Sequence, residues 1–246
     1  MRPRHPVPGA RPPVTDRATL DRTAEELCDA FGLTGRAQTS WGRWSRLADL
    51  YPGHPAFVIR GTDEGMTLDI QRWDISGGEA CWPTTQILSL SLPWWHRLAE
   101  RPGQRCLIPL TAGTAAPASR QEGAWDGGLG GKWDGEGEGG GWPTWFTLAD
   151  QPLFTVAGLW RGAGDTRCFA MLICLGDGPL ATMPVVIAPQ DRERWLNGAW
   201  SEVAALQAAC APERLRIGLF DPAVSAYAGK GRDGARPLSG GPMTGR

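Results

Sequence analysis

The sequence predicts an α+β fold dominated by one mostly antiparallel sheet. Many short segments are apolar in the manner of strands, only a few show helical spacing, and prolines and glycines separate nearly all of them. Many short strands with few helices are typical of an antiparallel α+β domain. A chain of 246 residues with 41% hydrophobic content can bury one sizeable core, so we expect a single domain.

The first regular element is predicted to be an amphipathic helix that follows Thr23. Thr23 and Glu26 have the capping-box spacing, in which each side chain accepts a hydrogen bond from the backbone of the other. Leu27 and Phe31 recur at helical spacing, and Gly32 stands where a C-terminal cap belongs. These signals together predict both ends of the helix.

Strands are expected along most of the remaining chain. The segments with strand character are 56–60, 66–70, 88–92, 106–110, 145–148, 154–159, 169–175, 183–187 and 215–219. Two further helices are expected at 191–196 and 200–209, between the last two strands. Apolar runs are far shorter than the roughly 20 residues that cross a bilayer, so we expect no membrane span.

Three segments are expected to lack regular structure. Residues 1–14 combine prolines with arginines and are predicted to be a flexible basic extension. Residues 117–142 are rich in glycine and are predicted to form a long surface loop. Residues 239–246 are predicted to be a flexible tail, which leaves 15–238 as the folded domain.

Charge and cysteine content limit the function classes. The formal net charge of -1 provides no overall electropositive field, so nucleic-acid binding would require a local basic patch. The six cysteines have no CxxC spacing, and the first residues show no signal-peptide pattern. A reduced, cytoplasmic setting is therefore expected.

Residue spacing offers little support for catalysis or metal binding. The three histidines, His5, His54 and His96, are not spaced with another ligand as a metal pair would be, so neither a metal nor a cofactor is expected. No nucleophile elbow lies near them. The thirteen tryptophans allow two interpretations, because such rings stack unpaired bases on a groove wall or fill a core.

Several sequence blocks between residues 15 and 238 occur in an order shared with a known family. The clearest block is WPTWFTLADQPLFTVAGLW at 142–160, which has a strand, a turn and an AGLW strand. Further blocks are YPGHPAFVIR at 51–60, RCLIP at 105–109, MPVVIAPQDRERW at 183–195 and the closing stretch at 224–238. In this order the blocks resemble the SOS response-associated peptidase (SRAP) family. The resemblance implies a bent, barrel-like sheet and a role with abasic sites in DNA during the SOS response.

The positions that match the family's catalytic residues carry other side chains. In that family an N-terminal cysteine captures the aldehyde of an abasic sugar as a thiazolidine, and an asparagine, a glutamate and a histidine assist. By resemblance these four positions fall at Thr15, Thr85, Ala116 and Leu180, with Thr84 and Ala115 as alternative placements. None of these side chains supplies the thiol, the acid or the imidazole. We therefore expect a pseudoenzyme with no catalytic residue.

The same resemblance implies positions for DNA contact. They are Arg17, Trp73, Arg105, Met183 and Pro184. Basic residues near both ends would add phosphate contacts that the nearly neutral body lacks: Arg2, Arg4, Lys230, Arg232 and Arg236. The first hypothesis is thus a binder of single-stranded or abasic DNA that does not form a crosslink.

Two alternatives of other classes stay open. One is an active DNA-processing or peptidase-type hydrolase, in which Thr15, His54 or His96 works after proteolytic trimming. The other is a protein-interaction module on the same fold, which would bind no DNA at any salt concentration.

Overall fold

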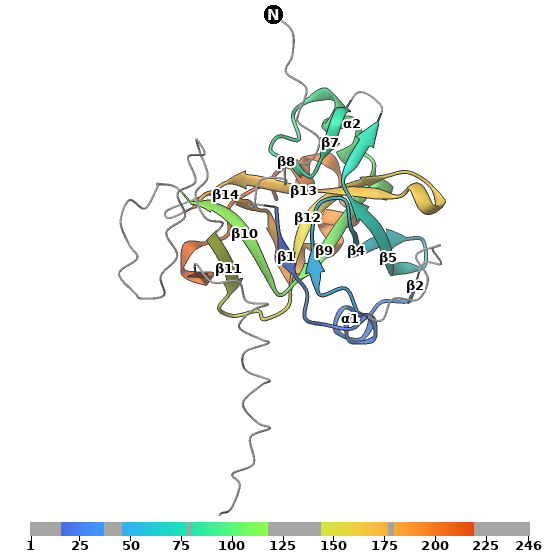
Figure 1. Cartoon of the computed structure of the whole chain (residues 1–246). Helices are drawn as coiled ribbons and strands as arrows, with labels where there is room; N and C mark the ends of the chain where they lie inside the picture. Colours follow the sequence, from blue (N-terminus) through green and yellow to red (C-terminus); the bar gives the residue numbers. More distant parts are fainter. Residues whose placement is uncertain (1–15, 37–45, 78–79, 118–143, 177–179, 219–246) are drawn as a thin grey trace, which may run out of the picture.

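A computed structural model describes residues 16–36, 46–77, 80–117, 144–176 and 180–218 of this chain. They form a single α+β domain with a large, curved, mostly antiparallel sheet and few helices (Figure 1). The strands of this sheet are β1 (Ala18–Thr19), β2 (Gly35–Arg36), β3 (Asp49–Leu50), β4 (Pro55–Thr62), β5 (Gly65–Trp73), β8 (Gln86–Ile87), β9 (Arg105–Leu110), β10 (Ala112–Pro117), β11 (Thr144–Leu148), β12 (Phe154–Arg161), β13 (Cys168–Leu175), β14 (Leu180–Pro184), β15 (Val186–Ile187) and β16 (Leu215–Gly218).

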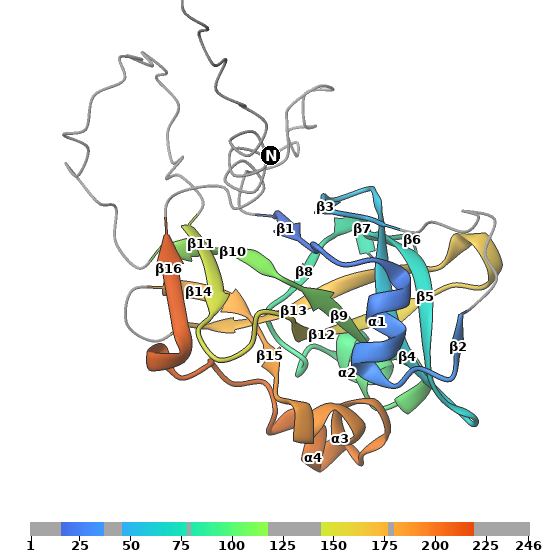
Figure 2. The same ribbon diagram turned by 90° about the horizontal axis from the view of Figure 1, so that it is seen from below.

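The remaining elements flank this sheet. Strands β6 (Ile75–Gly77) and β7 (Ala80–Thr84) pair with each other. Helix α1 (Ala24–Phe31) lies beside β5, and α3 (Arg192–Asn197) and α4 (Trp200–Ala204) pack together on another side (Figure 2). Helix α2 (Pro93–Ala99) leads into the short helical turn η1 (Pro102–Gln104), which precedes β9.

The strands pair out of sequence order, and one additional pairing curves the sheet. The main path runs β15, β12, β9, β4, β5, β13, β14, β10, β1 and β3, while β11 pairs with β10 and β16. The additional antiparallel pairing of β12 with β13 turns the first part of this path back on itself. Most neighbours are antiparallel, but β13 runs parallel to β5 and β8.

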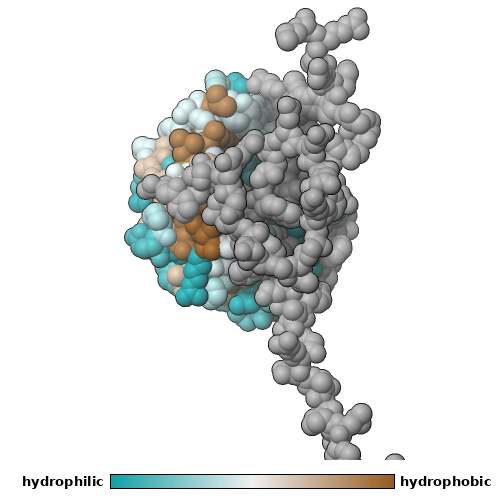
Figure 3. Space-filling view, turned by 60° about the vertical axis from the view of Figure 1, so that its left-hand side comes forward, coloured by the Kyte–Doolittle hydropathy of each residue, from teal (hydrophilic) through white to brown (hydrophobic). Residues whose placement is uncertain are grey.

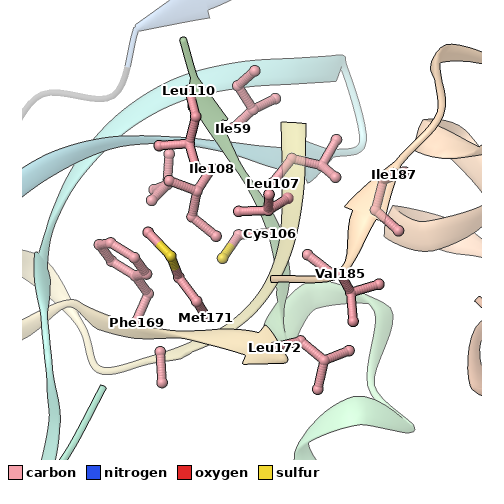
Figure 4. Close-up of a cluster of buried hydrophobic side chains, with 14 of the residues drawn as sticks. Ile59, Cys106, Leu107, Ile108, Leu110, Phe169, Met171, Leu172, Val185 and Ile187 are labelled. Atoms are coloured by element: carbon pink, nitrogen blue, oxygen red, sulfur yellow. The ribbon is translucent and has the colours of Figure 1, made fainter. Parts of the chain in front are cut away.

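The core fills the inside of this bend. Figure 4 shows side chains from β4, β9 and β13 pointing toward one another, including Ile59, Ile108 and Phe169, all with 0% exposure. Gly158 of β12 permits this packing, because a Cβ there would lie 2.5 Å from Cδ1 of Ile108. Close packing at these strands makes the sheet a rigid support for its edges.

Helix α1 has the ends that the sequence predicts. The backbone N–H of Glu26 donates to the hydroxyl of Thr23 at 3.2 Å, and the N–H of Thr23 donates to the Glu26 carboxylate at 2.6 Å. Gly32 ends the helix with φ of 60°, a left-handed conformation that glycine adopts at low cost. Both caps are confirmed.

Three predicted elements differ from the structure. The strand at 88–92 is wrong: the chain turns after β8, and α2 begins at Pro93, whose fixed φ suits the first helical position. Leu88 and Leu92 are more than half exposed. The segment 183–187 is divided between β14 and β15, and α4 ends at Ala204 rather than at residue 209.

Several predictions fall on segments outside the described residues. These are the extension at 1–14, the glycine-rich loop from residue 118 to 142, the closing stretch at 224–238 and the tail at 239–246. No helix within the described ranges combines the length and the apolar character needed to cross a membrane.

Candidate functional site

A small pocket lies where β8, β10, β13 and β14 meet. Its volume is about 50 Å³, which is room for a few groups the size of a water molecule. The lining residues are Gln86, Thr114, Ala115, Ala116, Ile173, Thr182, Met183 and Pro184. None of them carries a formal charge.

The antiparallel register of β14 builds two walls of this pocket. Ala116 of β10 lies opposite Thr182 of β14, and the next pair joins Pro117 to Leu180. On its other side β14 pairs with β13, where Ile173 lies opposite Pro184. Thus residues separated by more than 60 positions in the chain face the same space.

Strand β1 brings the start of the domain to the same place. Ala18 pairs with Gly113 of β10. The hydroxyl of Thr114 donates a hydrogen bond to the carbonyl oxygen of Arg17 at 2.8 Å. The same hydroxyl oxygen accepts a hydrogen bond from the backbone nitrogen of Arg17 at 3.0 Å. This exchange aligns residues 16 and 17 along the pocket.

Asp16 contacts the pocket wall directly. Its carboxylate accepts a hydrogen bond from the hydroxyl of Thr85 and another, at 2.6 Å, from the side-chain amide of Gln86. Gln86 lines the pocket, so the carboxylate charge lies one hydrogen bond from the lining. Thr85 and Asp16 belong to segments 69 residues apart.

Arg17 extends away from this contact toward two aromatic rings. Its guanidinium donates to the hydroxyl of Tyr51 at 2.7 Å. The same group lies 4.9 Å from the centre of the Tyr51 ring and 5.6 Å from that of Trp145. Cation–π attraction of this kind holds a half-buried positive charge in a defined position.

Trp73 is a core residue that positions the pocket wall. It is 1% exposed, stacks on Phe169 at a centroid distance of 6.2 Å, and donates from Nε1 to the carbonyl of Thr85 at 2.9 Å. The N–H of Met171 donates to the same carbonyl. A ring in this position fixes Thr85 and presents no face to a DNA base.

Arg105 is buried and stabilises helix ends. Its guanidinium donates to the carbonyl oxygens of Ala99 at 2.6 Å, Gly198 at 2.7 Å and Trp195 at 3.2 Å. These carbonyls lie at the C-terminal ends of α2 and α3, which otherwise lack partners in the helix. Burial lowers the pKa of this guanidinium, and at 1% exposure it cannot reach a phosphate.

The predicted positions therefore separate into two groups. Thr85, Ala116, Leu180, Met183 and Pro184 lie at or beside the pocket, with Arg17 next to it. Trp73 is buried behind the pocket wall, where it contacts Thr85, and Arg105 is buried at the ends of α2 and α3. Thr15 lies outside the described residues. Sequence reasoning missed Asp16, Gln86 and Thr182 as site residues, and it assigned no role to Tyr51 and Trp145; their contacts alone place them here.

The two described histidines have local partners. Nδ1 of His54 lies 3.2 Å from the carbonyl oxygen of Pro52, and its ring meets the edge of Tyr51. Nδ1 of His96 lies 3.5 Å from the Glu100 carboxylate, and the ring packs against Trp200 at 4.4 Å between ring centres. Neither contact joins an imidazole to a nucleophile.

Two buried thiols, those of Cys106 and Cys174, are unsuited to nucleophilic chemistry. Burial raises the pKa of Cys106 far above its usual range and that of Cys174 to about 11. A thiol becomes a nucleophile only as a thiolate, which these environments disfavour at neutral pH. Among the described residues, no three His, Cys, Asp or Glu side chains are grouped to hold a metal ion.

Comparisons with known proteins establish the fold only. Neither a family model nor a curated protein sequence matches this chain. A solved protein from Bacteroides thetaiotaomicron matches with a TM-score of 0.61 and 15% identity, covering 83% of this chain and 91% of that one. A protein from Bordetella bronchiseptica matches with a TM-score of 0.59 and 16% identity, covering 84% of this chain and 99% of that one. A second protein from the same organism, described as phage-related, matches with a TM-score of 0.58 and 14% identity, covering 82% of this chain and 92% of that one.

Proposed function

We propose that this chain is an SRAP-like protein that binds single-stranded or abasic-site DNA in the DNA damage response without forming a thiazolidine crosslink. The observation that carries the proposal is the gathering of Thr85, Ala116 and Leu180 around one pocket, beside the segment that follows Thr15. Three of the positions chosen from the sequence resemblance lie close together, which supports their common origin in one site. The SOS context and a cytoplasmic location belong to this proposal.

The absence of crosslinking follows from the side chains at these positions. The hydroxyl of Thr85 donates to Asp16, while Ala116 and Leu180 carry no proton-transfer group. In the sequence, Thr15 follows fourteen other residues, so its amine is part of a peptide bond. A site of this composition is suited to binding and has no group that captures an aldehyde.

Arg17 is the described side chain best suited to contact a phosphate. It lies next to the pocket, and its position is held by Tyr51 and Trp145. Guanidinium groups bind phosphate through paired N–H donors. The terminal residues Arg2, Arg4, Lys230, Arg232 and Arg236 would add charge that the body lacks.

The test is binding to a single-stranded oligonucleotide that bears one abasic site, compared with an intact strand and a duplex. Fluorescence anisotropy measures the affinity, and a denaturing gel detects any covalent adduct. We expect binding that weakens steeply as salt rises, with no adduct. A covalent adduct would contradict the pseudoenzyme assignment, and no binding at low salt would contradict the DNA assignment.

Two arginine variants test where on the protein DNA binds. Arg17→Ala is expected to weaken binding about tenfold, because it removes the held guanidinium. Arg101→Ala removes the same charge from an exposed position between α2 and η1 and is expected to change the affinity little. Equal effects of the two variants would indicate a general charge effect and no defined site.

A second candidate, a protein-interaction module, is favoured by exposed apolar side chains. Leu88, Leu92 and Leu175 are 52%, 55% and 71% exposed. Leu88 follows β8 and Leu175 ends the adjacent β13, and Gln207 bridges the backbone carbonyls of Leu88 and Ile173. One face of the molecule shows separate hydrophobic areas among paler and hydrophilic surface (Figure 3). If DNA binding fails, this candidate becomes the leading one.

A further inference from the structure

Two polar side chains in the pocket lining have hydrogen-bonding atoms without a partner in the described part of the chain. Thr182 lies within β14, and its hydroxyl forms no hydrogen bond with any described residue. Gln86 begins β8, and of its side-chain amide only the nitrogen is bonded to a described residue. The Thr114 hydroxyl donates to the carbonyl of Arg17, and the other lining side chains are apolar. Recognition of a polar group in this pocket therefore depends on Gln86 and Thr182.

The hydrogen bond to Asp16 fixes the direction of the Gln86 amide. A carboxylate accepts hydrogen bonds, so the amide nitrogen is the atom that faces Asp16, at 2.6 Å, whether or not the carboxylate has further partners. The amide is planar, and its oxygen and nitrogen diverge from one carbon, so Oε1 is directed away from Asp16. Amide oxygens accept hydrogen bonds and never donate them. The Gln86 side chain therefore holds an acceptor in a fixed direction.

The pocket limits the size and the charge of what it holds. Its volume of about 50 Å³ is about a third of a cavity that holds one benzene ring, so it admits roughly two or three non-hydrogen atoms. A nucleobase is too large for this space. None of the lining side chains is charged, so nothing in the lining offsets the cost of desolvating an ion. The occupant that matches is a small uncharged group that donates a hydrogen bond.

We infer that the pocket binds the hydroxyl end of a small uncharged ligand, with Oε1 of Gln86 as the selecting acceptor and the Thr182 hydroxyl as the second contact. A ligand hydroxyl donates to Gln86 and accepts from Thr182 at the same time. A ligand carbonyl accepts from Thr182 but leaves the Gln86 oxygen without a donor. An acceptor left unsatisfied on ligand binding weakens the affinity, so a hydroxyl is preferred over a carbonyl by about tenfold.

The preference for a hydroxyl depends on the pocket alone, whereas the molecule that carries this hydroxyl rests on the proposed function. An abasic sugar has a hydroxyl at its first carbon when the ring is closed, and an aldehyde oxygen at that carbon when the ring is open. The pocket would therefore select the closed form. The closed form has no free aldehyde, which agrees with binding without a crosslink.

The first test compares ethanol with acetonitrile as probes of the full-length protein. The two molecules have the same number of non-hydrogen atoms, but only ethanol donates a hydrogen bond. NMR shifts of the methyl groups of Ile173 and Met183, which line the pocket, report binding. We expect saturable shifts with ethanol at a concentration about tenfold lower than with acetonitrile. Equal affinities, or no saturable shift with either probe, would overturn the inference.

Two variants test the two contacts separately. Gln86→Met removes the acceptor and keeps the side-chain length, and Thr182→Val removes the hydroxyl and keeps the shape. Each should weaken ethanol binding about fivefold or more. Thr182→Val breaks no hydrogen bond between described residues, so it keeps the test decisive if Gln86→Met fails to fold. Gln190→Met and Thr147→Val are the controls, because both positions lie outside the lining, and they should bind ethanol as the wild type does. Unchanged ethanol affinity in Thr182→Val, or an equal loss in the controls, would contradict the inference.

Abasic oligonucleotides separate this inference from the proposed function. One strand carries a reduced abasic site, which keeps a hydroxyl at the first sugar carbon, and the other carries a tetrahydrofuran site, which lacks it. We expect the first to bind about tenfold tighter, and the difference to disappear in Gln86→Met. If neither strand binds while ethanol is selected over acetonitrile, the proposed function fails and the inference stands. If both strands bind equally and ethanol is not selected, the proposed function stands and the inference fails.

Discussion

Two arginines of this protein show how burial decides what a side chain does. Arg17 is half-buried between Tyr51 and Trp145, so its guanidinium keeps access to solvent and to a ligand. Arg105 is fully buried, and its donors are directed at the carbonyls of α2 and α3. The residue type is the same, but only the first position is suited to bind phosphate.

Arg105→Lys tests whether Arg105 stabilises the fold or contacts DNA phosphate. A lysine keeps the positive charge but cannot reach several carbonyls in a fixed plane, so we expect the free energy of unfolding to fall by about 2 kcal/mol. Urea denaturation measures this loss, and the exposed Arg101→Lys is the control, expected within about 0.5 kcal/mol of wild type. DNA affinity of the folded Arg105→Lys protein should be unchanged; a selective loss of affinity would return Arg105 to the DNA site.

A buried thiol makes stability depend on pH in the alkaline range. Burial raises the pKa of Cys174 from 9.0 to about 11, so the folded protein binds this proton more tightly than the unfolded chain does. The resulting stability is present below about pH 9 and is lost as pH rises toward 11. Between about pH 8 and about pH 11 the wild type should lose about 2 kcal/mol more than Cys174→Ala.

Denaturant titrations of both proteins across this range test the thiol prediction. The comparison cancels groups that titrate there independently of Cys174, including Cys106, whose pKa burial also raises. Parallel pH profiles for wild type and Cys174→Ala would contradict the prediction.

For single helices and strands, local sequence signals predict the element correctly where residues typical of both its ends are present. Thr23, Glu26 and Gly32 mark α1, and the structure has the caps they predict. Around 88–92, alternating leucines suggest a strand, yet Pro93 begins a helix there. Alternation alone does not distinguish a strand from a turn in which Leu90 is buried while Leu88 and Leu92 point to solvent, because the partner strand is absent from the local sequence.

The helix cap gives a prediction with a matched control. Gly32→Ala places a Cβ in open space at φ of 60°, so its cost is the backbone conformation alone, about 1 kcal/mol. Gly103→Ala also places a Cβ in open space, without a positive φ, and should be nearly neutral. Thermal unfolding of the two variants compares them, and an equal loss would show that the left-handed conformation at Gly32 does not cause the cost.

At the scale of the whole molecule, a buried charge ties distant strands together. Asp69 of β5 accepts from Arg60 of β4 at 2.8 Å and forms an ion pair with Arg167, just before β13, at 3.4 Å. It also accepts from the side chain of Gln71 at 2.9 Å. This network lies where β4, β5 and β13 are neighbours, and thus where the sheet bends.

Asp69→Asn tests the contribution of this network to the fold. The change removes the carboxylate charge that faces two largely buried guanidinium groups, so we expect a loss of about 3 kcal/mol in the free energy of unfolding. Asp63→Asn, in the exposed β4–β5 turn, removes an equal charge and serves as the control. A urea midpoint for Asp69→Asn close to that of Asp63→Asn would show that the network adds no net stability.

Much of the candidate site was accessible from the sequence, but only as scattered positions. Thr85, Ala116, Met183 and Pro184 were chosen by resemblance, and they lie together at the pocket or beside it. The sequence does not predict Asp16 as a site residue, because its role depends on hydrogen bonds to residues 69 and 70 positions away. Contacts between residues this far apart produce no periodic or local pattern in the sequence.

Side-chain periodicity and capping act between near neighbours, so the α+β class, the ends of α1 and most strand positions follow from the sequence alone. Strand order, the burial of Arg105 and Trp73, and the hydrogen bonds that join Asp16 to Thr85 and Gln86 depend on the tertiary fold. These properties depend on which distant segments meet. A local pattern cannot specify that choice, because the whole core selects it through packing and the pairing of buried polar groups.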